Sequence, residues 1–331
     1  MAAMRAIQVV GEGKDARLVP AEAAKPELRA GEIRVAVAAT AVNRADLMQR
    51  RGLYPPPPGA SPILGLECAG VVTELGPGAS GFARGDRVMA LLGGGGYAEE
   101  VCVDHGSALA VPDSMSDEEA GAFPEVFFTA FSNIFLPGLG ALGPGESALV
   151  HGGGGGVGTA AIVLLRESGN RCIVTVGSAE KARRCVELGA SDAIDYRTED
   201  FADRVGTLTE GRGVHVILDH IGGRYLGQNL SALAIGGRLV EIGLMGGAQS
   251  EINLALLLSR RLAVIGSTLR GRSLAEKASI VRAFRERFGA ALAAGRLRPI
   301  VHAVFPLAAA AEAHRLMKAS DHFGKIVLRV G

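Results

Sequence analysis

Five consecutive glycines follow a short apolar run and open a segment with helical character. Residues 147–151 form the apolar run, and Gly153, Gly155 and Gly158 then fit the spacing G-x-G-x-x-G. Glycines at these positions permit a tight turn, a close approach of the backbone to a pyrophosphate, and close packing of helix on strand. The spacing predicts a dinucleotide site at a helix N-terminus, and a merely flexible loop is the alternative. The loop residues expected to hold the cofactor are Gly153, Gly155, Gly156, Val157 and Gly158.

The glycine loop is followed by a predicted helix and a second predicted strand. The residues after that strand distinguish a site for NAD from a site for NADP. A site for NAD places Asp or Glu about 20 residues after the glycines, where it accepts hydrogen bonds from the ribose. Here the predicted strand at residues 172–176 is followed by Gly177 and Ser178. Ser178 can bond to a 2′-phosphate and Lys181 can add positive charge, although Lys181 could also be a solvated surface residue. We therefore expect NADPH, held in part by Gly177, Ser178 and Lys181.

Two kinds of sequence pattern divide the chain. Short Val-, Ile- and Ala-rich runs bounded by Gly, Pro or Asp fill the first 120 residues, whereas strands alternate with helix-length segments from Gly145 onward. The alternation is typical of a parallel, doubly wound sheet. The predicted strands at residues 300–305 and 325–330 resemble the runs of the first 120 residues in their composition. We predict an α/β protein with a discontinuous β-rich domain (1–125 and 296–331) and a cofactor domain (126–295).

Composition excludes several classes of protein. The chain has 35 Lys plus Arg against 34 Asp plus Glu, so its net charge of +1 creates no field that would hold a polyanion or an anionic membrane. Its apolar stretches are far shorter than the ~20 residues of a membrane helix, and its first residues lack a secretory apolar region. The four cysteines have no metal-binding or redox spacing. We expect a cytoplasmic protein that binds neither nucleic acid nor membrane.

Four segments resemble the zinc-free quinone oxidoreductase branch of the medium-chain dehydrogenase/reductase superfamily. The segment from Asn43 to Pro55 fits the pattern N-x-x-D-x-x-x-x-x-G-x-Y-P of that branch. LGLECAG at residues 64–70 with GDRV at 85–88, the glycine loop, and GKIVL at 324–328 complete the resemblance. The run NRADLMQR and the segment IGLMGG look most like the tumour-suppressor-inducible NADPH quinone reductase subgroup. The resemblance implies a GroES-like catalytic domain, a Rossmann domain and a cleft between them.

This sequence differs from the zinc-dependent alcohol dehydrogenases of the superfamily at the positions of the metal ligands. Those members bind zinc through a Cys or Asp near the position of Asn43, a His before the matching Glu, and a later Cys. Here Leu66 precedes Glu67, no Cys lies between Thr40 and Tyr54, and glycines replace the four-Cys lobe around residues 93–96. A tetrahedral site of thiolates and imidazole cannot be assembled from these residues. We expect no metal, and Glu67 as a structural or pocket carboxylate.

The resemblance also implies roles for individual residues. Asn43 and Tyr54 would line the substrate pocket near the nicotinamide, Thr129 would contact the carboxamide, and Tyr196 would neighbour the adenine ribose. Each has another reading: Asn43 as a helix cap, Tyr54 as an anchor of the proline stretch, Thr129 bonded to its own backbone, and Tyr196 in a surface turn. Further cofactor contacts are expected at strand ends, from Leu244, Met245, Ser267, Thr268 and Leu269.

These observations favour a zinc-independent NADPH:quinone oxidoreductase. Without a metal or a Ser-His-Asp set, the protein would bind the nicotinamide, orient the acceptor and exclude water. His151 is expected to be a neutral, structural histidine, and no histidine is assigned to catalysis. A 2-enoyl thioester or enone reductase using Tyr54 as proton donor is one alternative, and a non-catalytic NADPH-binding protein is another. Relatives usually pair the edge strands of their Rossmann sheets, so we expect a homodimer.

Overall fold

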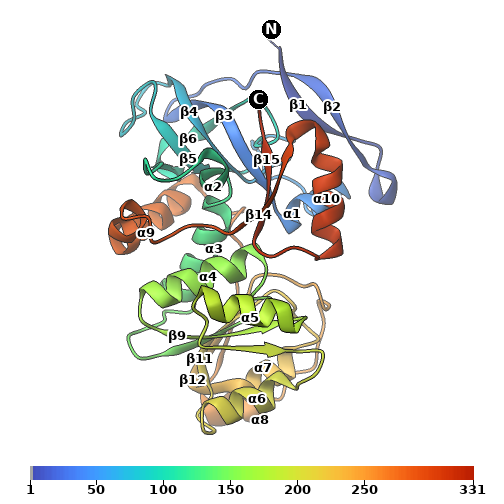
Figure 1. Cartoon of the computed structure of the whole chain (residues 1–331), viewed down its shortest axis with the longest axis vertical. Coiled ribbons are helices and arrows are strands. Elements are labelled where there is room, and N and C mark those ends of the chain that lie inside the picture. The colour runs from blue at the N-terminus through green and yellow to red at the C-terminus, as the bar shows by residue number, and fades with distance from the viewer. Residues whose placement is uncertain (1–2) are drawn as a thin grey trace. The chain divides into compact units, whose positions relative to one another are not determined.

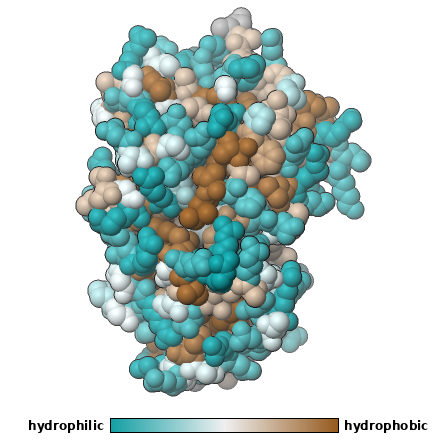
Figure 2. Space-filling model, in the orientation of Figure 1, coloured by the Kyte–Doolittle hydropathy of each residue, from teal (hydrophilic) through white to brown (hydrophobic). Residues whose placement is uncertain are grey.

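A computed structural model describes residues 3–331 and shows a mixed α/β chain of two compact units. Among the described residues, unit 1 comprises residues 3–128 and Leu269–Gly331, and unit 2 comprises Thr129–Thr268. Among the described residues, no helix is long and apolar enough to cross a membrane. Figure 2 shows hydrophilic residues over most of the visible face, interrupted by strips of hydrophobic residues.

Unit 1 is built on a mostly antiparallel sheet in the order β14-β15-β3-β4-β5-β7, with β6 also paired to β3. The C-terminal strands β14 and β15 lie beside the N-terminal strand β3 (Figure 1), as the sequence predicted. Its strands are β1 Ala3–Val10, β2 Arg17–Ala24, β3 Glu32–Val42, β4 Glu67–Leu75, β5 Arg87–Leu91, β6 Glu100–Asp104, β7 Ala108–Ala110, β14 Val301–Pro306 and β15 Lys325–Arg329. Its helices are α1 Arg44–Arg50, α2 Asp117–Gly121, α9 Leu274–Ala293 and α10 Ala310–Ala319, with short 3-10 turns η1 Gly13–Asp15, η2 His105–Ser107 and η3 Leu307–Ala309.

Unit 2 has a parallel sheet in the order β10-β9-β8-β11-β12-β13. In Figure 1, α4 and α5 lie on one face of this sheet and α6, α7 and α8 on the other, so the sheet is doubly wound. Its strands are β8 Ser147–Val150, β9 Arg171–Val176, β10 Asp192–Asp195, β11 Val214–Asp219, β12 Leu233–Glu241 and β13 Ala263–Gly266. Its helices are α4 Gly156–Glu167, α5 Ala179–Leu188, α6 Phe201–Leu208, α7 Leu226–Ala232 and α8 Leu254–Arg260, and α3 Pro124–Phe135 contains the first unit boundary.

The unit boundaries differ from the predicted ones, which were 125/126 and 295/296. The chain returns to unit 1 at Leu269, so α9 belongs with the β-rich unit. The reason is packing: the ring of Phe284 on α9 meets Phe123 and Phe128 edge to face, with centroids 5.8 and 5.3 Å apart. Helix α9 begins after Ser273, which accepts a hydrogen bond from the Glu276 N–H and donates its own N–H to the Glu276 carboxylate.

Two strands differ from what the sequence predicts. The apolar residues at 97–103 predict a strand over that range, but β6 begins at Glu100, and the segment before it forms an isolated bridge, Ala6 to Ala98. The strand β2 was not predicted. It pairs only with β1, and Pro20 lacks the N–H that an interior strand would need.

Candidate functional site

In unit 2 the glycine loop joins β8 to α4 under tight steric limits. A Cβ on Gly153 would lie 2.6 Å from the Cβ of Val174, and one on Gly158 would lie 2.3 Å from the carbonyl oxygen of Gly152. Only hydrogen fits at either position, because real Cβ contacts are not this short. The two glycines therefore allow the start of α4 to pack closely against the strand and loop.

Gly155 differs, because its missing side chain leaves open space. It is the N-cap of α4, with extended backbone angles (φ −82°, ψ 173°), and the only described atom near its absent Cβ is the Gly152 carbonyl oxygen at 3.3 Å. The N–H groups of the first turn of α4 have no partner within the helix. An anion can approach these groups closely, so the residues present fit a dinucleotide pyrophosphate, which Gly155, Gly156, Val157 and Gly158 would hold.

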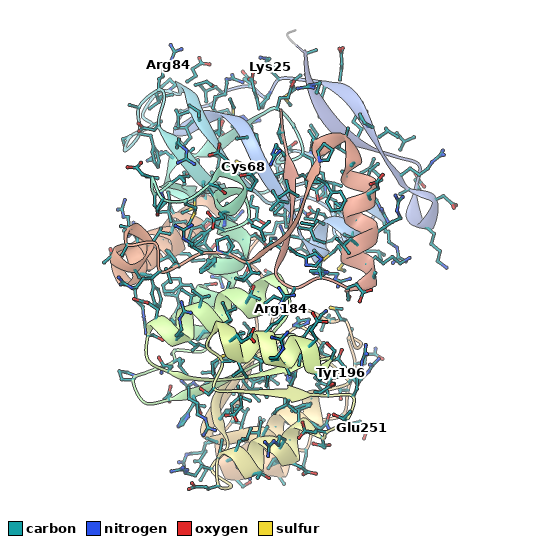
Figure 3. All side chains as sticks on the ribbon, viewed as in Figure 1. Lys25, Cys68, Arg84, Arg184, Tyr196 and Glu251 are labelled. Carbon is teal, nitrogen blue, oxygen red and sulfur yellow. The ribbon has the colours of Figure 1, made fainter. Side chains whose placement is uncertain are left out.

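The ends of β9 and β10 bring three predicted cofactor residues together. A Cβ on Gly177 would lie 2.6 Å from the phenol oxygen of Tyr196, so the tyrosine ring needs glycine at its side. Ser178 is the N-cap of α5, where its hydroxyl accepts a hydrogen bond of 3.2 Å from the Lys181 N–H. The Tyr196 side chain is 44% exposed. Figure 3 labels Tyr196, which follows β10, and Arg184, which extends from α5.

A chain of buried, hydrogen-bonded side chains begins at His151, the residue before the glycine loop. The ring nitrogens of His151 lie 2.9 Å from the Thr175 hydroxyl and 2.8 Å from Asn229 Oδ1, and Asn229 donates its amide N–H to Asp219 at 2.9 Å. Because Asn229 Oδ1 can only accept, His151 Nε2 carries the proton and Nδ1 accepts from Thr175. Burial lowers the pKa of His151, although Asp219 and Asn229 oppose the shift. His151 is thus a neutral structural residue with both nitrogens engaged.

Two acidic residues meet at the ends of β11 and β12. Asp219 accepts hydrogen bonds from the backbone N–H groups of Ile221 at 2.6 Å and Gly222 at 3.1 Å. Burial and the neighbouring Asp219 carboxylate raise the pKa of Glu241 to about 8. Glu241 is therefore mostly protonated at neutral pH.

The remaining predicted cofactor residues lie on α3 and in the segments that follow the neighbouring strands β12 and β13. Thr129 is buried on α3, and its carbonyl accepts a hydrogen bond of 2.8 Å from Asn133. Leu244 and Met245 are exposed in the loop after β12. Ser267 donates its N–H to the Glu241 carbonyl, and Thr268 ends unit 2. Leu269, expected beside them, is buried in unit 1.

Unit 1 contains a fully buried ion pair between β4 and β15. Lys325 Nζ lies 2.8 Å from Glu67 Oε1, and the two side chains are 2% and 0% exposed. Lys325 also donates to Asn43 Oδ1 at 2.6 Å and to the Val42 carbonyl at 3.1 Å. Asn43 Nδ2 donates to the same Glu67 oxygen at 2.8 Å. All three ammonium protons have acceptors, which is the condition for burying such a pair.

Asn43 has the capping role that its sequence position suggested, whereas its place in the substrate pocket stays a prediction. It is the N-cap of α1, and its backbone N–H donates to Asp46 Oδ2 at 2.8 Å. Its side chain reaches the buried pair of Glu67 and Lys325. The start of α1 is thereby fixed to β4 and β15.

Asp46 is a second buried carboxyl in unit 1. It accepts hydrogen bonds from the Gly65 N–H at 3.1 Å and the Tyr97 hydroxyl at 3.2 Å. Burial raises its pKa to about 6, although these donors and Lys325 oppose the shift. The Tyr97 oxygen also lies 3.0 Å from His314 Nε2, and burial lowers the pKa of that histidine to about 3. Below pH 6 protonation of Asp46 would remove an acceptor from this network.

Tyr54 is held by a buried arginine that the sequence did not single out. Arg270 is 4% exposed and its guanidinium lies 5.2 Å from the centroid of the Tyr54 ring. It donates to the Tyr54 carbonyl at 3.2 Å, to Gln49 Oε1 at 2.7 Å and to the Gly93 carbonyl at 2.9 Å. Tyr54 is thus positioned from its backbone and from its ring face.

Sequence reasoning missed Lys325, Arg270 and Glu125 as site residues. GKIVL contributed to the resemblance but did not indicate a role for its lysine, and Arg270 carried no local signal. Glu125 has the second position of α3, where an acidic residue is common, so its sequence context is ordinary.

Two family models match the chain. The alcohol dehydrogenase GroES-like domain matches residues 29–113, and the zinc-binding dehydrogenase model matches residues 156–283. The human synaptic vesicle membrane protein VAT-1 homolog is 33% identical over 325 residues, covering 93% of this chain and 81% of that protein. The chain belongs to the medium-chain dehydrogenase/reductase superfamily. The comparisons place this medium-chain dehydrogenase/reductase in the zinc-free quinone oxidoreductase-like branch, as the sequence predicted.

Two further similarities bear on the reaction of this medium-chain dehydrogenase/reductase. The structure of Escherichia coli quinone oxidoreductase complexed with NADPH matches with a TM-score of 0.82 and 27% identity, covering 99% of this chain and all of that one. A phenolphthiocerol/phthiocerol polyketide synthase of Mycobacterium tuberculosis is 33% identical over 301 residues, 90% of this chain. The chain spans only 14% of that synthase. The chain therefore belongs to a superfamily of dehydrogenases and reductases, and the solved structure of one similar protein contains NADPH.

The residues found at the positions of the zinc ligands do not form a metal site. Within residues 3–331, no three His, Cys, Asp or Glu side chains cluster as a metal ion would require. Leu66 stands at the position of the histidine ligand, and the neighbouring Glu67 faces the Lys325 ammonium and the Asn43 amide. A lysine and an amide nitrogen offer hydrogen-bond donors, whereas a cation needs electron-pair donors.

Proposed function

We propose that the chain is a zinc-independent, NADPH-dependent reductase of quinones. The observation that carries the cofactor assignment is Ser178, an uncharged N-cap at the end of β9, with Lys181 in the next turn. A carboxylate at that position would repel a 2′-phosphate. The likeness to a quinone oxidoreductase complexed with NADPH supports both cofactor and substrate. Bound NADPH would supply the hydride, while Asn43 and Tyr54 would position the acceptor.

A 2-enoyl thioester or enone reductase is the second candidate. The similarity to a polyketide synthase is the observation that favours it. The distinguishing experiment is NADPH oxidation, followed by absorbance, with an ortho-quinone and a 2-enoyl thioester in parallel and NADH as the cofactor control. Turnover of the quinone supports the proposal, turnover of the thioester alone replaces it, and binding of NADPH without either activity indicates a non-catalytic protein.

The variant Ser178→Asp tests the cofactor assignment. Aspartate caps a helix as well as serine does, so the fold should be retained, but its charge opposes the 2′-phosphate. Like-charge contacts cost several kcal/mol, so the preference for NADPH over NADH, measured as a ratio of kcat/KM, should fall at least about 100-fold. Asn253→Asp, at the N-cap of α8 in the same unit, is the matched control and should leave the ratio unchanged. An unchanged ratio in Ser178→Asp would refute the assignment.

We also propose that the protein forms a symmetric homodimer through the edge of the unit 2 sheet. The supporting observations are that β13 is an edge strand and that Leu254 and Leu258 of the preceding helix are 60% and 76% exposed. Size-exclusion chromatography with light scattering should give twice the 34.1 kDa mass of the chain, and Leu258→Arg should shift it toward one chain. A monomer at micromolar concentration contradicts this proposal.

A further inference from the structure

Three carboxyl groups lie close together in unit 1, and two of them are fully engaged. Glu67 uses one oxygen for Asn43 and Lys325 and the other for the Glu125 N–H, at 2.9 Å. Asp46 uses its oxygens for the Gly65 and Asn43 N–H groups and the Tyr97 hydroxyl. Neither group can exchange a proton with a substrate without breaking these bonds.

Glu125 is different, because only its backbone is engaged. Across residues 3–331 its carboxyl group makes no hydrogen bond or ion pair. Its position is nevertheless fixed, since the Glu125 N–H is bonded to Glu67 at the start of α3. The residue as a whole is partly exposed.

Charged and titratable groups face Glu125 from every element packed around it. Burial and the Glu67 carboxylate raise its pKa to about 8, with a smaller contribution from Asp46, and two lysines oppose the shift. Glu125 is therefore mostly protonated at neutral pH. Its electrostatic neighbours are Glu67 on β4, Asp46 on α1, Tyr54 after α1, Arg270 before α9, Lys277 on α9 and Lys325 on β15.

Glu125 is a better acid for this site than its neighbour Tyr54. Burial and the Glu125 charge raise the pKa of Tyr54 above its ordinary value of 10, although Arg270 opposes the shift. A group transfers protons most effectively when its pKa is near the working pH. Lys277 is only 5% exposed, whereas Glu125 is partly exposed as a residue.

We infer that Glu125 is the catalytic acid that protonates the reduced acceptor. Hydride transfer adds two electrons and one hydrogen to a quinone or enone and leaves a negative charge on its oxygen. The O–H bond of Glu125 then breaks, its electron pair stays on the carboxylate, and the proton forms a new bond to the acceptor. Water returns the proton to Glu125. This inference rests on the proposed reductase function.

The experiment is the pH dependence of NADPH oxidation in Glu125→Gln. The wild-type kcat should fall as pH rises through about 8, because the acid loses its proton. At pH 7 the variant should lose about 100-fold in kcat, a usual effect of losing a general acid, and show no fall near pH 8. NADPH affinity, measured by fluorescence, should be unchanged. Glu125→Asp should recover part of the rate, and Glu286→Gln, on the exposed side of α9, is the matched control.

Thermal unfolding without cofactor gives a second readout. A carboxyl whose pKa rises from 4.5 to about 8 on folding contributes stability at low pH that is lost progressively between these two values. Glu125→Gln removes this loss, so its Tm should exceed that of the wild type by at least ~3 °C at pH 8.5 and by much less at pH 4.5. A Tm difference that does not change with pH would overturn the inference, even if the variant were inactive.

The outcomes separate this inference from the function on which it rests. If the wild-type protein turns over neither a quinone nor an enone, the proposed function fails and the inference fails with it. If the wild-type protein is active and Glu125→Gln has the same pH profile as the wild type, the role of Glu125 is refuted and the proposed function is retained. A fall near pH 8 that disappears in Tyr54→Phe but persists in Glu125→Gln also overturns it, because the phenol would then be the donor.

Discussion

Gly158→Ala should abolish NADPH binding and destabilise unit 2. The added methyl carbon would lie 2.3 Å from the Gly152 carbonyl oxygen and 2.6 Å from the Gly153 Cα, and neither backbone atom can rotate away. The glycine loop must therefore separate from α4, which displaces the N–H groups expected to hold the pyrophosphate. A loss of at least about 100-fold in affinity is expected, equivalent to ~2.7 kcal/mol. Fluorescence titration with NADPH and thermal unfolding measure the two effects.

Two other glycines separate cofactor binding from folding. Gly206 lies in α6 with nothing within 4 Å of its absent Cβ, so Gly206→Ala should stabilise the helix by up to ~1 kcal/mol and leave affinity unchanged. In Gly155→Ala the added methyl carbon lies 3.3 Å from one oxygen, so unit 2 should still fold. The methyl group would occupy the space through which a pyrophosphate approaches the start of α4, so the affinity for NADPH should fall. If Gly155→Ala binds NADPH normally, the loop does not hold the pyrophosphate.

Local patterns of the sequence were sufficient to predict most of unit 2. Its strands are short apolar runs separated by helix-length segments, and the sequence predicts strands at 192–195 and 214–219, which are the bounds of β10 and β11. The glycine spacing depends on contacts between residues near in the chain, so it could be interpreted without a structure. Ser178 could be placed after β9 for the same reason. Whether these residues bind NADPH remains a prediction.

Contacts between distant residues could not be predicted in this way. The apolar face of α9 was evident, but its pattern does not say which unit it packs against, and the boundary was placed 27 residues too late. Lys325 and Glu67 are 258 positions apart, and nothing near either residue indicates the other. The pKa of Glu125 depends on Glu67 and on burial, neither of which is encoded in the residues beside it.

Lys325→Met should have the largest effect on stability in unit 1. Methionine can fill most of the space of the lysine stem, but it leaves the Glu67 carboxylate buried without its cation. Removing one member of a buried ion pair costs about 3–5 kcal/mol, because the remaining charge is uncompensated. The free energy of unfolding should fall by that amount in urea at pH 7. Circular dichroism is the suitable probe, since the chain contains no tryptophan.

The control and the double variant decide whether charge or packing causes the loss. Lys318→Met removes an exposed lysine on α10 and should change stability by less than about 0.5 kcal/mol. Adding Glu67→Gln to Lys325→Met removes the uncompensated charge. The free energy of unfolding of the double variant should therefore exceed that of Lys325→Met by at least ~1 kcal/mol. Equal stability of the single and double variants would show that the carboxylate does not need its cation. Asn43 contacts both members of the ion pair and is the N-cap of α1, so Lys325→Met should also loosen the start of α1. Because Tyr54 follows α1 in the chain, the stability of the ion pair is connected to the position of Tyr54.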